Sequence, residues 1–400
     1  MPRASRFLVL AALAAASIVG VWCCLPRLSA MAFIVRVAKP EGTLGRLARL
    51  AGGKVSEEPI FTLPARHGPM PARTYRPARQ ARRTTILVPG IHMDGIAEER
   101  LVGLAKELAA TGLQVLTVAP PDLTRYRITT DTVDELEDAI AWAVGEPDLA
   151  PDGKVGITGF SFSGGLALVA AGRPAVRDKV AFASSFGGHA DLLRVLRYLC
   201  GQDLGPTPST AQARVLVQGA EHIHIPKPHD YGGVVALLNL ADRVVPQAQV
   251  AALAEAVTLF LQASSIDRVD PAKSQPVFAQ ARRLGEGMPK PSRTLMKYVS
   301  DRDVAKLGEA LAPLLAGLDL PADLSPERAP APTAPVFLLH GADDSVVPAT
   351  EMLSLARKLR SETRVRAFGS RLITHAEVNR QAALAEMWQL AGFWQDLMSR

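Results

Sequence analysis

Short apolar runs alternate with amphipathic segments along the first half of the chain. Residues 84–88 form a β-branched run that ends at a Pro-Gly pair, which indicates a buried strand. Leucines at helical spacing predict a helix over 98–110, and an apolar run predicts a second strand over 113–118. An acidic start and helical spacing predict another helix over 131–144. This alternation predicts an α/β fold, with a mainly parallel sheet and helices on both faces.

The same rhythm extends in both directions from these elements. Short strands are expected at 60–63, 71–75, 154–158 and 180–186, with a helix beginning at 164–171. Near the C-terminus we expect strands at 336–339 and 364–368, a helix at 350–359 and a last helix at 381–398. The expected core face of that last helix consists of Leu384, Trp388, Ala391, Phe393 and Trp394.

Between these two α/β stretches lie about 145 residues with mostly helical patterns. Leu253, Val257 and Phe260, for example, fall on one helical face. The stretch ends in Pro321–Pro335, a linker whose five prolines disfavour helices and central strands. We therefore expect a core formed by 58–190 and 335–400, interrupted by a helical cap over 191–334.

The N-terminus has the pattern of a membrane anchor or an export signal. Phe7–Leu25 is uncharged and follows two arginines, and its 19 residues are long enough to span a bilayer. The small-x-small sequence Ala30-Met31-Ala32 leaves cleavage of an export signal as an alternative, and a buried helix is a third interpretation. Residues 1–32 are thus expected to hold an extracytoplasmic domain at the membrane, or to release it after export.

Composition excludes several classes of protein. Hydrophobic residues make up 48% and charged residues 21% of the 400, so the chain is not mainly disordered. The net charge of +6 includes three arginines that flank the apolar segment, and the remaining charge is too small and scattered to indicate nucleic-acid binding. Cys200 stands apart from Cys23 and Cys24, and no zinc-binding spacing occurs. We interpret Cys200 as a small buried hydrophobe rather than a catalytic thiol.

One candidate nucleophile lies between a predicted strand and helix, in the segment 159–165 (Gly-Phe-Ser-Phe-Ser-Gly-Gly). A sharp strand-to-helix turn exposes a serine hydroxyl above the sheet, provided that the residues two before and two after it are small. Gly159 and Ser163 satisfy that requirement around Ser161. Ser163 itself is a rival nucleophile, and a glycine-rich turn that only packs the helix is the non-catalytic interpretation.

Candidate partners for this serine follow two later strands. Asp344 lies in the loop after the strand at 336–339, where a carboxylate can orient a catalytic imidazole. Its neighbour Asp343 is the alternative acid. His375 follows the last predicted strand and is the only histidine after Asp344.

Together these motifs resemble the α/β-hydrolase superfamily, whose triad has the chain order Ser, Asp, His. The loop 88–95 (Val-Pro-Gly-Ile-His-Met-Asp-Gly) is similar to its oxyanion loop. The resemblance covers about 58–190 and 335–398, and it places the helical cap after the sixth strand, where this superfamily often carries a lid. It implies a cofactor-free and metal-free enzyme.

The resemblance also implies residue roles. Ser161 attacks an acyl carbonyl, His375 transfers the proton, and Asp344 orients the imidazole. The backbone N–H groups of Phe162 and Ile91 bind the oxyanion. His92 and Asp94, next to that loop, are possible substrate contacts. We therefore expect a serine hydrolase of carboxylic esters or related acyl compounds, with a small apolar acyl substrate.

Several alternatives stay open at this point. Acyltransferases, thioesterases and peptidases use the same triad, and a non-catalytic binding or scaffold protein can share the fold. His222, His224 and His229 crowd into eight residues of the cap, where either a metal site or a polar lid loop would explain them. The acyl chain, the leaving group and the oligomeric state leave no mark in the sequence.

Overall fold

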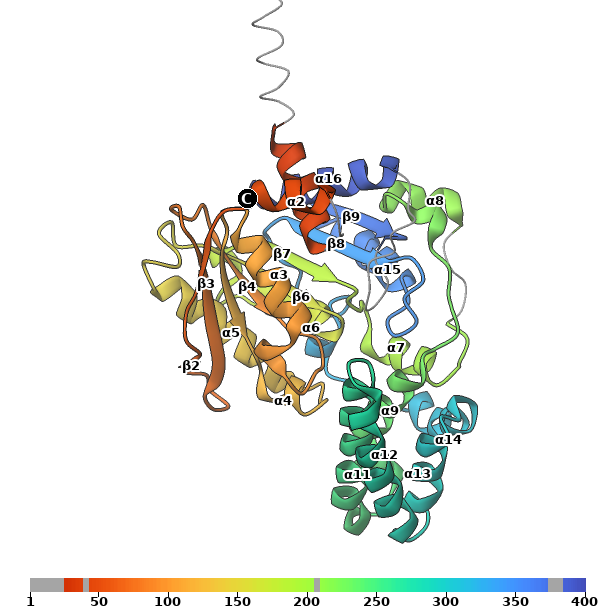
Figure 1. Ribbon diagram of the computed structural model, residues 1–400. Helices are drawn as coiled ribbons and strands as arrows, with labels where there is room; N and C mark the ends of the chain where they lie inside the picture. The colour runs from red at the N-terminus through yellow and green to blue at the C-terminus, as the bar shows by residue number, and fades with distance from the viewer. Residues whose placement is uncertain (1–24, 39–42, 205–208, 373–383) are drawn as a thin grey trace, which may run out of the picture.

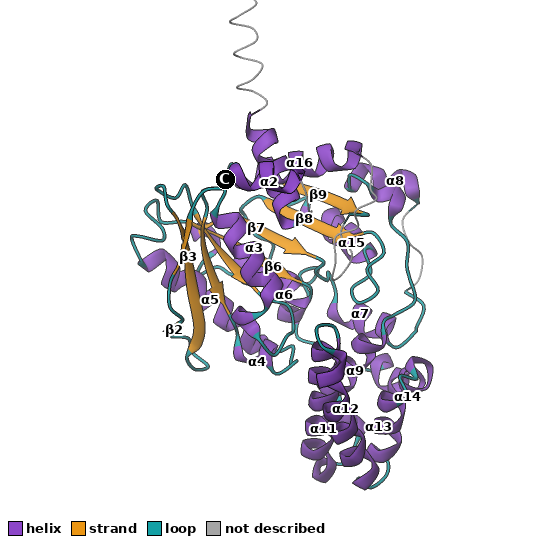
Figure 2. Ribbon diagram, in the orientation of Figure 1, coloured by secondary structure: helices purple, strands orange, loops and turns teal. Residues whose placement is uncertain are grey.

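A nine-stranded sheet forms the centre of the protein (Figures 1 and 2). The computed structural model describes residues 25–38, 43–204, 209–372 and 384–400. The strand order is β1-β3-β5-β4-β6-β7-β8-β9, with β2 paired to β3. β3 runs antiparallel to β1, β2 and β5, and every other pairing is parallel. The strands are β1 (Val55–Glu57), β2 (Phe61–Leu63), β3 (Met70–Pro77), β4 (Thr84–Val88), β5 (Gln114–Val118), β6 (Val155–Phe160), β7 (Val180–Phe186), β8 (Val336–Gly341) and β9 (Val365–Ser370).

Helices cover both faces of the sheet, as the sequence predicts. Successive residues of β4 point to opposite sides: Ile86 and Val88 join one apolar core and Leu87 joins the other. On the first side pack α5 (Thr130–Gly145), α6 (Phe162–Gly172) and α15 (Thr350–Leu359). On the second pack α3 (Glu99–Ala109) and α16 (Leu384–Met398). All five positions of β4 are buried, which explains its continuous apolar run.

This strand order, with its antiparallel edge and the crossover that places β5 outside β4, is that of the α/β-hydrolase fold. Counted in chain order, β7 is the sixth of the eight strands on the main path. The helical insertion follows β7, and β8 resumes the sheet directly after the proline-rich linker. The predicted fold class and the position of the cap are therefore confirmed.

The insertion contains helices α7 to α14, several of which form a bundle beyond the sheet (Figure 1). The helices are α7 (Leu192–Leu199), α8 (Thr210–Leu216), α9 (Asp230–Asn239), α10 (Ala241–Val244), α11 (Gln247–Asp267), α12 (Pro271–Gly287), α13 (Ser292–Ser300) and α14 (Val304–Ala316). Leu253, Val257 and Phe260 of α11 are buried, as their helical spacing predicts. Among the described helices, α11 is the one that is long and apolar enough to cross a membrane. Its buried residues pack in the interior of the cap.

The two ends of the described chain meet on one face of the core. Residues 25–37 form a helix, and its Phe33 is 1% exposed and packs edge-on against Trp394 of α16 with 4.7 Å between ring centroids. Buried Arg36 pairs with Glu107 of α3 at 2.5 Å. All but the last residue of the predicted anchor Phe7–Leu25 lies outside the described residues.

Trp388 departs from the prediction for the last helix. Ala391, Phe393 and Trp394 of α16 are buried, but Trp388 is 43% exposed. The buried face of the helix runs through Leu390, Ala391, Phe393, Trp394 and Leu397, and Trp388 lies outside it. Arg27 covers the indole instead, with its guanidinium 4.7 Å from the ring centroid.

The elements that the sequence did not predict are short, or expose apolar residues where a core-facing pattern would bury them. Among them are β1, α2 (Thr43–Leu50) and α4 (Pro121–Thr124). β1 has three residues and no buried one, so it carries no apolar alternation. α4 is a single turn with Pro121 at its start.

Candidate active site

Ser161 occupies a sharp turn between β6 and α6. β6 ends at Phe160 and α6 begins at Phe162, which leaves one residue to reverse the chain. Ser161 has φ +55° and ψ −134°, a conformation that non-glycine residues rarely adopt. Its N–H donates to the carbonyl of Phe186 on β7 at 2.8 Å. The turn therefore fixes the serine at the carboxyl end of the sheet and at the N-terminus of a helix.

The small residues around Ser161 are required by this turn. A Cβ on Gly159 would come within 2.2 Å of the Ser163 carbonyl oxygen, so only glycine fits there. Ser163 is fully buried, and its hydroxyl accepts the Phe160 N–H at 2.9 Å. The same hydroxyl lies 2.8 Å from the Phe160 carbonyl and 3.1 Å from that of Val88. These contacts give Ser163 a structural place in the turn, which weakens its case as the rival nucleophile.

The loop after β4 passes beside Ser161. A Cβ built on Gly90 would lie 3.5 Å from the Ser161 Cβ, which shows how closely the two backbones approach. Ile91 follows Gly90 and is 8% exposed. Phe162 is the first residue of α6, so its N–H has no acceptor within the helix. Both proposed oxyanion donors thus belong to segments that flank the serine.

Asp344 lies in the loop that follows β8, at the same end of the sheet. It is 2% exposed, whereas its neighbour Asp343 is exposed. Its Oδ1 accepts the N–H groups of Val346 at 2.8 Å and Val347 at 3.0 Å. Its Oδ2 lies 3.5 Å from Nε2 of His340. Backbone donors therefore hold the Asp344 carboxylate in one orientation.

Neighbouring strands bring Ser161 and Asp344 to one edge. β6 pairs with β7 and β7 with β8, all in parallel, so the loops after them emerge side by side. The loop after β7 lies close to the loop that holds Asp344, because a Cβ built on Gly187 would lie 3.4 Å from Oδ2 of Asp344. His375 belongs to 373–383, outside the described residues. Its strand, β9, ends at Ser370 beside Gly341 at this same edge.

His92 and Asp94 stand on the loop beside the proposed oxyanion donor. The His92 side chain is 13% exposed, and its Nδ1 lies 3.5 Å from an oxygen of Asp94. Burial lowers the pKa of His92, because it disfavours the charged imidazolium. Nδ1 accepts the Asp94 N–H at 3.3 Å, which a neutral ring can do. His92 is thus a neutral donor or acceptor beside the site.

Tyr231 of α9 connects the cap to this loop and was not predicted. Its hydroxyl donates to the Ile91 carbonyl at 3.3 Å. Asn239, at the end of the same helix, donates to the Tyr126 carbonyl at 2.9 Å and accepts the Ile128 N–H at 2.9 Å. Tyr231 lies 140 residues from Ile91 in sequence, and no local motif marks it.

The histidine-rich cap segment runs along the loop that holds Asp344. The His224 N–H donates to Ala342 at 3.4 Å, and the His229 N–H donates to Ser345 at 2.9 Å. His229 also pairs with Asp230 at 2.7 Å. In the described part of the chain, three ligand atoms meet instead at His67, Asp131 and Asp134. Arg66 and Arg173 both pair with Asp134 of that cluster, so it forms an ion-pair network.

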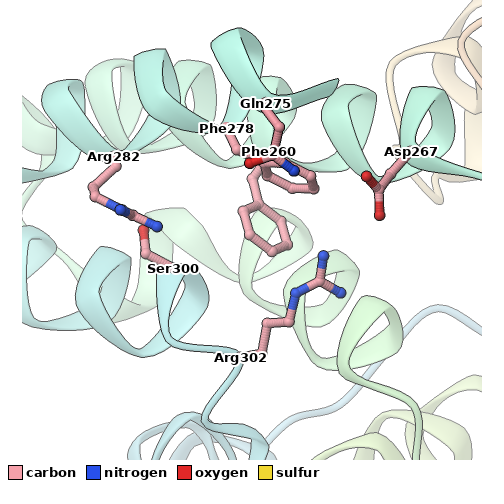
Figure 3. Close-up of a pocket in the computed structure, with 7 residues that line it drawn as sticks. All are labelled: Phe260, Asp267, Gln275, Phe278, Arg282, Ser300 and Arg302. Atoms are coloured by element: carbon pink, nitrogen blue, oxygen red, sulfur yellow. The ribbon is translucent and has the colours of Figure 1, made fainter. Parts of the chain in front are cut away.

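A pocket of about 180 Å³ opens in the outer cap (Figure 3). The guanidinium of Arg302 lies there over two rings, 5.7 Å from the centroid of Phe260 and 5.4 Å from that of Phe278. Arg302 also donates to Asp230 at 2.8 Å. Neither Ser161 nor Asp344 lines this pocket, so it is separate from the candidate active site.

No family model and no curated protein matches this chain. Solved structures do match. Acylaminoacyl peptidase from Pyrococcus horikoshii is 12% identical with a TM-score of 0.45, and the match covers 90% of this chain but 44% of the peptidase. An esterase from Pyrobaculum calidifontis is 17% identical with a TM-score of 0.44, covering 93% and 92% of the two chains. Brefeldin A esterase, a bacterial homologue of human hormone sensitive lipase, is 12% identical with a TM-score of 0.41, covering 93% and 83%.

The fold assignment rests on the architecture of the chain itself. Its strand order, the turn at Ser161 after β6 and the cap after β7 agree with the pattern expected from the sequence. The chain therefore has the α/β-hydrolase fold, with a helical cap inserted between β7 and β8.

Proposed function

We propose that the protein is a serine hydrolase that cleaves carboxylic esters or related acyl compounds. The observation that carries this proposal is the backbone of Ser161, which adopts φ +55° between a strand and the N-terminus of a helix. A positive φ strains the backbone of a serine, and a serine that only packs the turn does not need this strain. A nucleophile benefits from it, because the turn exposes the hydroxyl and places two backbone N–H donors nearby. Asp344, buried and oriented at the same edge, supports the proposal.

The reaction proposed for these residues has two halves. Ser161 Oγ attacks the acyl carbonyl carbon while its proton passes to His375, and the tetrahedral oxyanion accepts the N–H groups of Phe162 and Ile91. The C–O bond to the leaving group breaks, and His375 returns the proton to the departing alkoxide. Water then repeats these steps on the acyl-enzyme and releases the acid. Asp344 holds the imidazole and stabilises its charged form.

Ester hydrolysis is the simplest member of a group of reactions that this constellation supports. Thioester, amide and acyl-transfer chemistry use the same groups, and a binding protein could retain the fold without activity. His92 and Asp94, beside the oxyanion loop, are proposed substrate contacts. The proposed acyl group is apolar, because the predicted anchor Phe7–Leu25 would hold the domain at a membrane, where apolar acyl compounds collect.

Covalent labelling tests the proposal directly. A fluorophosphonate probe should label Ser161, identified by mass spectrometry, and the label should vanish in Ser161→Ala. Labelling at Ser163 instead would mean that the nucleophile is misassigned. Absence of labelling in protein shown to be folded, together with no turnover of short and long p-nitrophenyl esters, would favour the non-catalytic binding protein.

We further propose that the N-terminal segment holds the domain on the extracytoplasmic side of a membrane. The uncharged sequence Phe7–Leu25 after two arginines supports this location. The outer surface of the membrane is accessible in spheroplasts, so protease added to intact spheroplasts should digest the domain without lysis. Digestion only after lysis would place the domain in the cytoplasm.

A further inference from the structure

The helix α2 exposes two of its leucines, Leu47 and Leu50, and buries the small residue Ala48. Ala48 is 7% exposed, whereas Leu47 is 59% and Leu50 is 83% exposed. Arg46 and Arg49, which alternate with these leucines along the helix, are exposed as well. A helix that only covers a core in water does the reverse, because burying leucine is favourable. The exposed leucines of α2 therefore indicate a surface that contacts an environment less polar than water.

The helix at 25–37 continues this surface. Leu25 and Leu28 are 49% and 52% exposed, while Phe33 on the other side is buried. Arg36 of this helix donates to the Ala48 carbonyl at 3.3 Å, so the two helices lie against each other (Figure 1). The four exposed leucines thus belong to neighbouring elements at one end of the molecule.

Trp388 adds an interfacial aromatic residue to the same surface. Its ring, 43% exposed, lies under the guanidinium of Arg27, which also donates to the Trp388 carbonyl at 3.0 Å. Tryptophan and arginine are favoured where an apolar layer meets polar headgroups, because each has an apolar body and a polar end. We call the exposed side chains of 25–28, of α2 and of Trp388 the α2 face.

The charges of the α2 face have one sign. Neither 25–37 nor 43–50 contains aspartate or glutamate, and Arg46 and Arg49 are exposed. Leucines interspersed with arginines on an exposed helix are typical of segments that lie in the headgroup region of anionic bilayers. The described chain also begins on this face, at Leu25, directly after the uncharged residues 7–24 of the sequence.

We propose that the α2 face lies flat on the surface of an anionic lipid bilayer. The leucines and Trp388 enter the boundary between headgroups and acyl chains, and the arginines contact lipid phosphates. This contact is independent of Ser161 and rests on the proposed location of the domain at a membrane. It would fix the orientation of the whole domain at the membrane, with the cap bundle at the far end of the molecule (Figure 1).

Spin labels on the full-length chain test the contact. A nitroxide is attached at Leu50→Cys or, as a control, at Val269→Cys in the cap, because both positions are 83% exposed. Cys23 and Cys24 are replaced by serine, and Cys200 stays unlabelled because burial raises its pKa to about 12. The protein is reconstituted in vesicles of phosphatidylcholine with phosphatidylglycerol. Collision rates with oxygen and with a water-soluble nickel complex are then measured.

The contact predicts a several-fold higher oxygen-to-nickel ratio at position 50 than at position 269, since oxygen concentrates in the bilayer and the nickel complex is excluded from it. Replacing Arg46 and Arg49 by glutamate should lower the ratio at position 50 and leave position 269 unchanged. Equal ratios at both positions would overturn the proposal. Dipolar broadening between labels at position 50 would overturn it too, because a second copy of the chain would then cover the face.

Discussion

Ser163 stands where the turn around Ser161 usually has a glycine, and its hydroxyl has become part of the turn. It accepts the Phe160 N–H and lies within 3.1 Å of two carbonyl oxygens. We expect Ser163→Ala to lower the free energy of unfolding by about 1–3 kcal/mol, because a buried N–H loses its acceptor. Urea denaturation measures this loss. The fluorophosphonate label should still form at Ser161.

Ser184→Ala is the matched control for this change. Ser184 is equally buried, but its hydroxyl finds no hydrogen-bond partner among the described residues. Its removal should therefore change stability little. If Ser163→Ala instead kept full stability and lost the label, Ser163 would be a reactive group rather than a part of the turn.

Glu135 on α5 is a buried carboxyl whose charge the fold disfavours. It is 3% exposed, and burial together with nearby Asp122 and Asp131 raises its pKa to about 7. Between pH 4.5 and 7 the unfolded chain loses this proton while the folded chain keeps it, so stability falls as pH rises through that window. Glu135→Gln should stabilise the protein at pH 8 by up to about 3 kcal/mol and have little effect at pH 4.

Denaturation curves at the two pH values measure the effect of Glu135→Gln. Glu137→Gln on the same helix is the control, because Glu137 pairs with Arg66 at 2.8 Å and Arg173 at 3.1 Å. Its loss should destabilise the protein at pH 8. A pH-independent effect of Glu135→Gln would show that the carboxyl is already ionised without penalty in the folded state.

At the scale of elements, α9 of the cap supports the loop that carries Ile91. Tyr231 donates to the Ile91 carbonyl, and we expect Tyr231→Phe to lower kcat about fivefold, since a hydrogen bond contributes about 1 kcal/mol. KM should change little, because the oxyanion contact strengthens in the transition state. Steady-state kinetics on an ester substrate measures both constants.

Tyr298→Phe on α13 makes the same chemical change in the outer cap, and its kcat should match that of the natural chain. A rise in KM for Tyr231→Phe with an unchanged kcat would contradict the positioning role. Tyr231 would then contact the substrate or only close the cap.

Local patterns determined which elements the sequence could predict. The predicted bounds of β4, β7 and α15 agree with the structure, because each is a continuous apolar or amphipathic run with clear ends. The turn at Ser161 and the acidic loop at Asp344 were also visible, since each combines small or polar residues with a preceding strand. Tyr231 was not, because its role depends on a contact across 140 residues. The sequence does not predict α2, because Leu47 and Leu50 face outward and form no core-facing pattern.

At the scale of the whole molecule, contacts distant in sequence tie the cap and the C-terminal residue to one sheet. Arg127 donates to the Leu238 carbonyl at 3.1 Å, and Arg173 joins α6 to Asp323 near the end of the insertion at 2.6 Å. Arg83, before β4, donates to the carbonyl of the last residue, Arg400, at 2.8 Å. The sequence predicts the sheet and the helices that cover it. It does not predict these hydrogen bonds, because each joins residues that only the folded chain brings together.

The helix at 25–37 decides whether the N-terminal region is a removable leader or part of the folded domain. Phe33 is 1% exposed and packs on Trp394, so Phe33→Ala in the full-length chain should lower the free energy of unfolding by about 3–5 kcal/mol. Leu28→Ala, at a site 52% exposed, should change it by less than about 0.5 kcal/mol. Denaturation in a mild detergent measures both.

A large difference between these two variants would mean that cleavage after Ala32 removes part of a helix on which the core depends. Ala30, which is fully buried, would be lost by such a cut. Retention of 25–37 would then follow from stability, and with it the anchoring of the domain through the residues before Leu25. If Phe33→Ala proved as mild as Leu28→Ala, the helix would contribute little to the fold, and cleavage at the Ala30-Met31-Ala32 sequence would leave a stable exported domain.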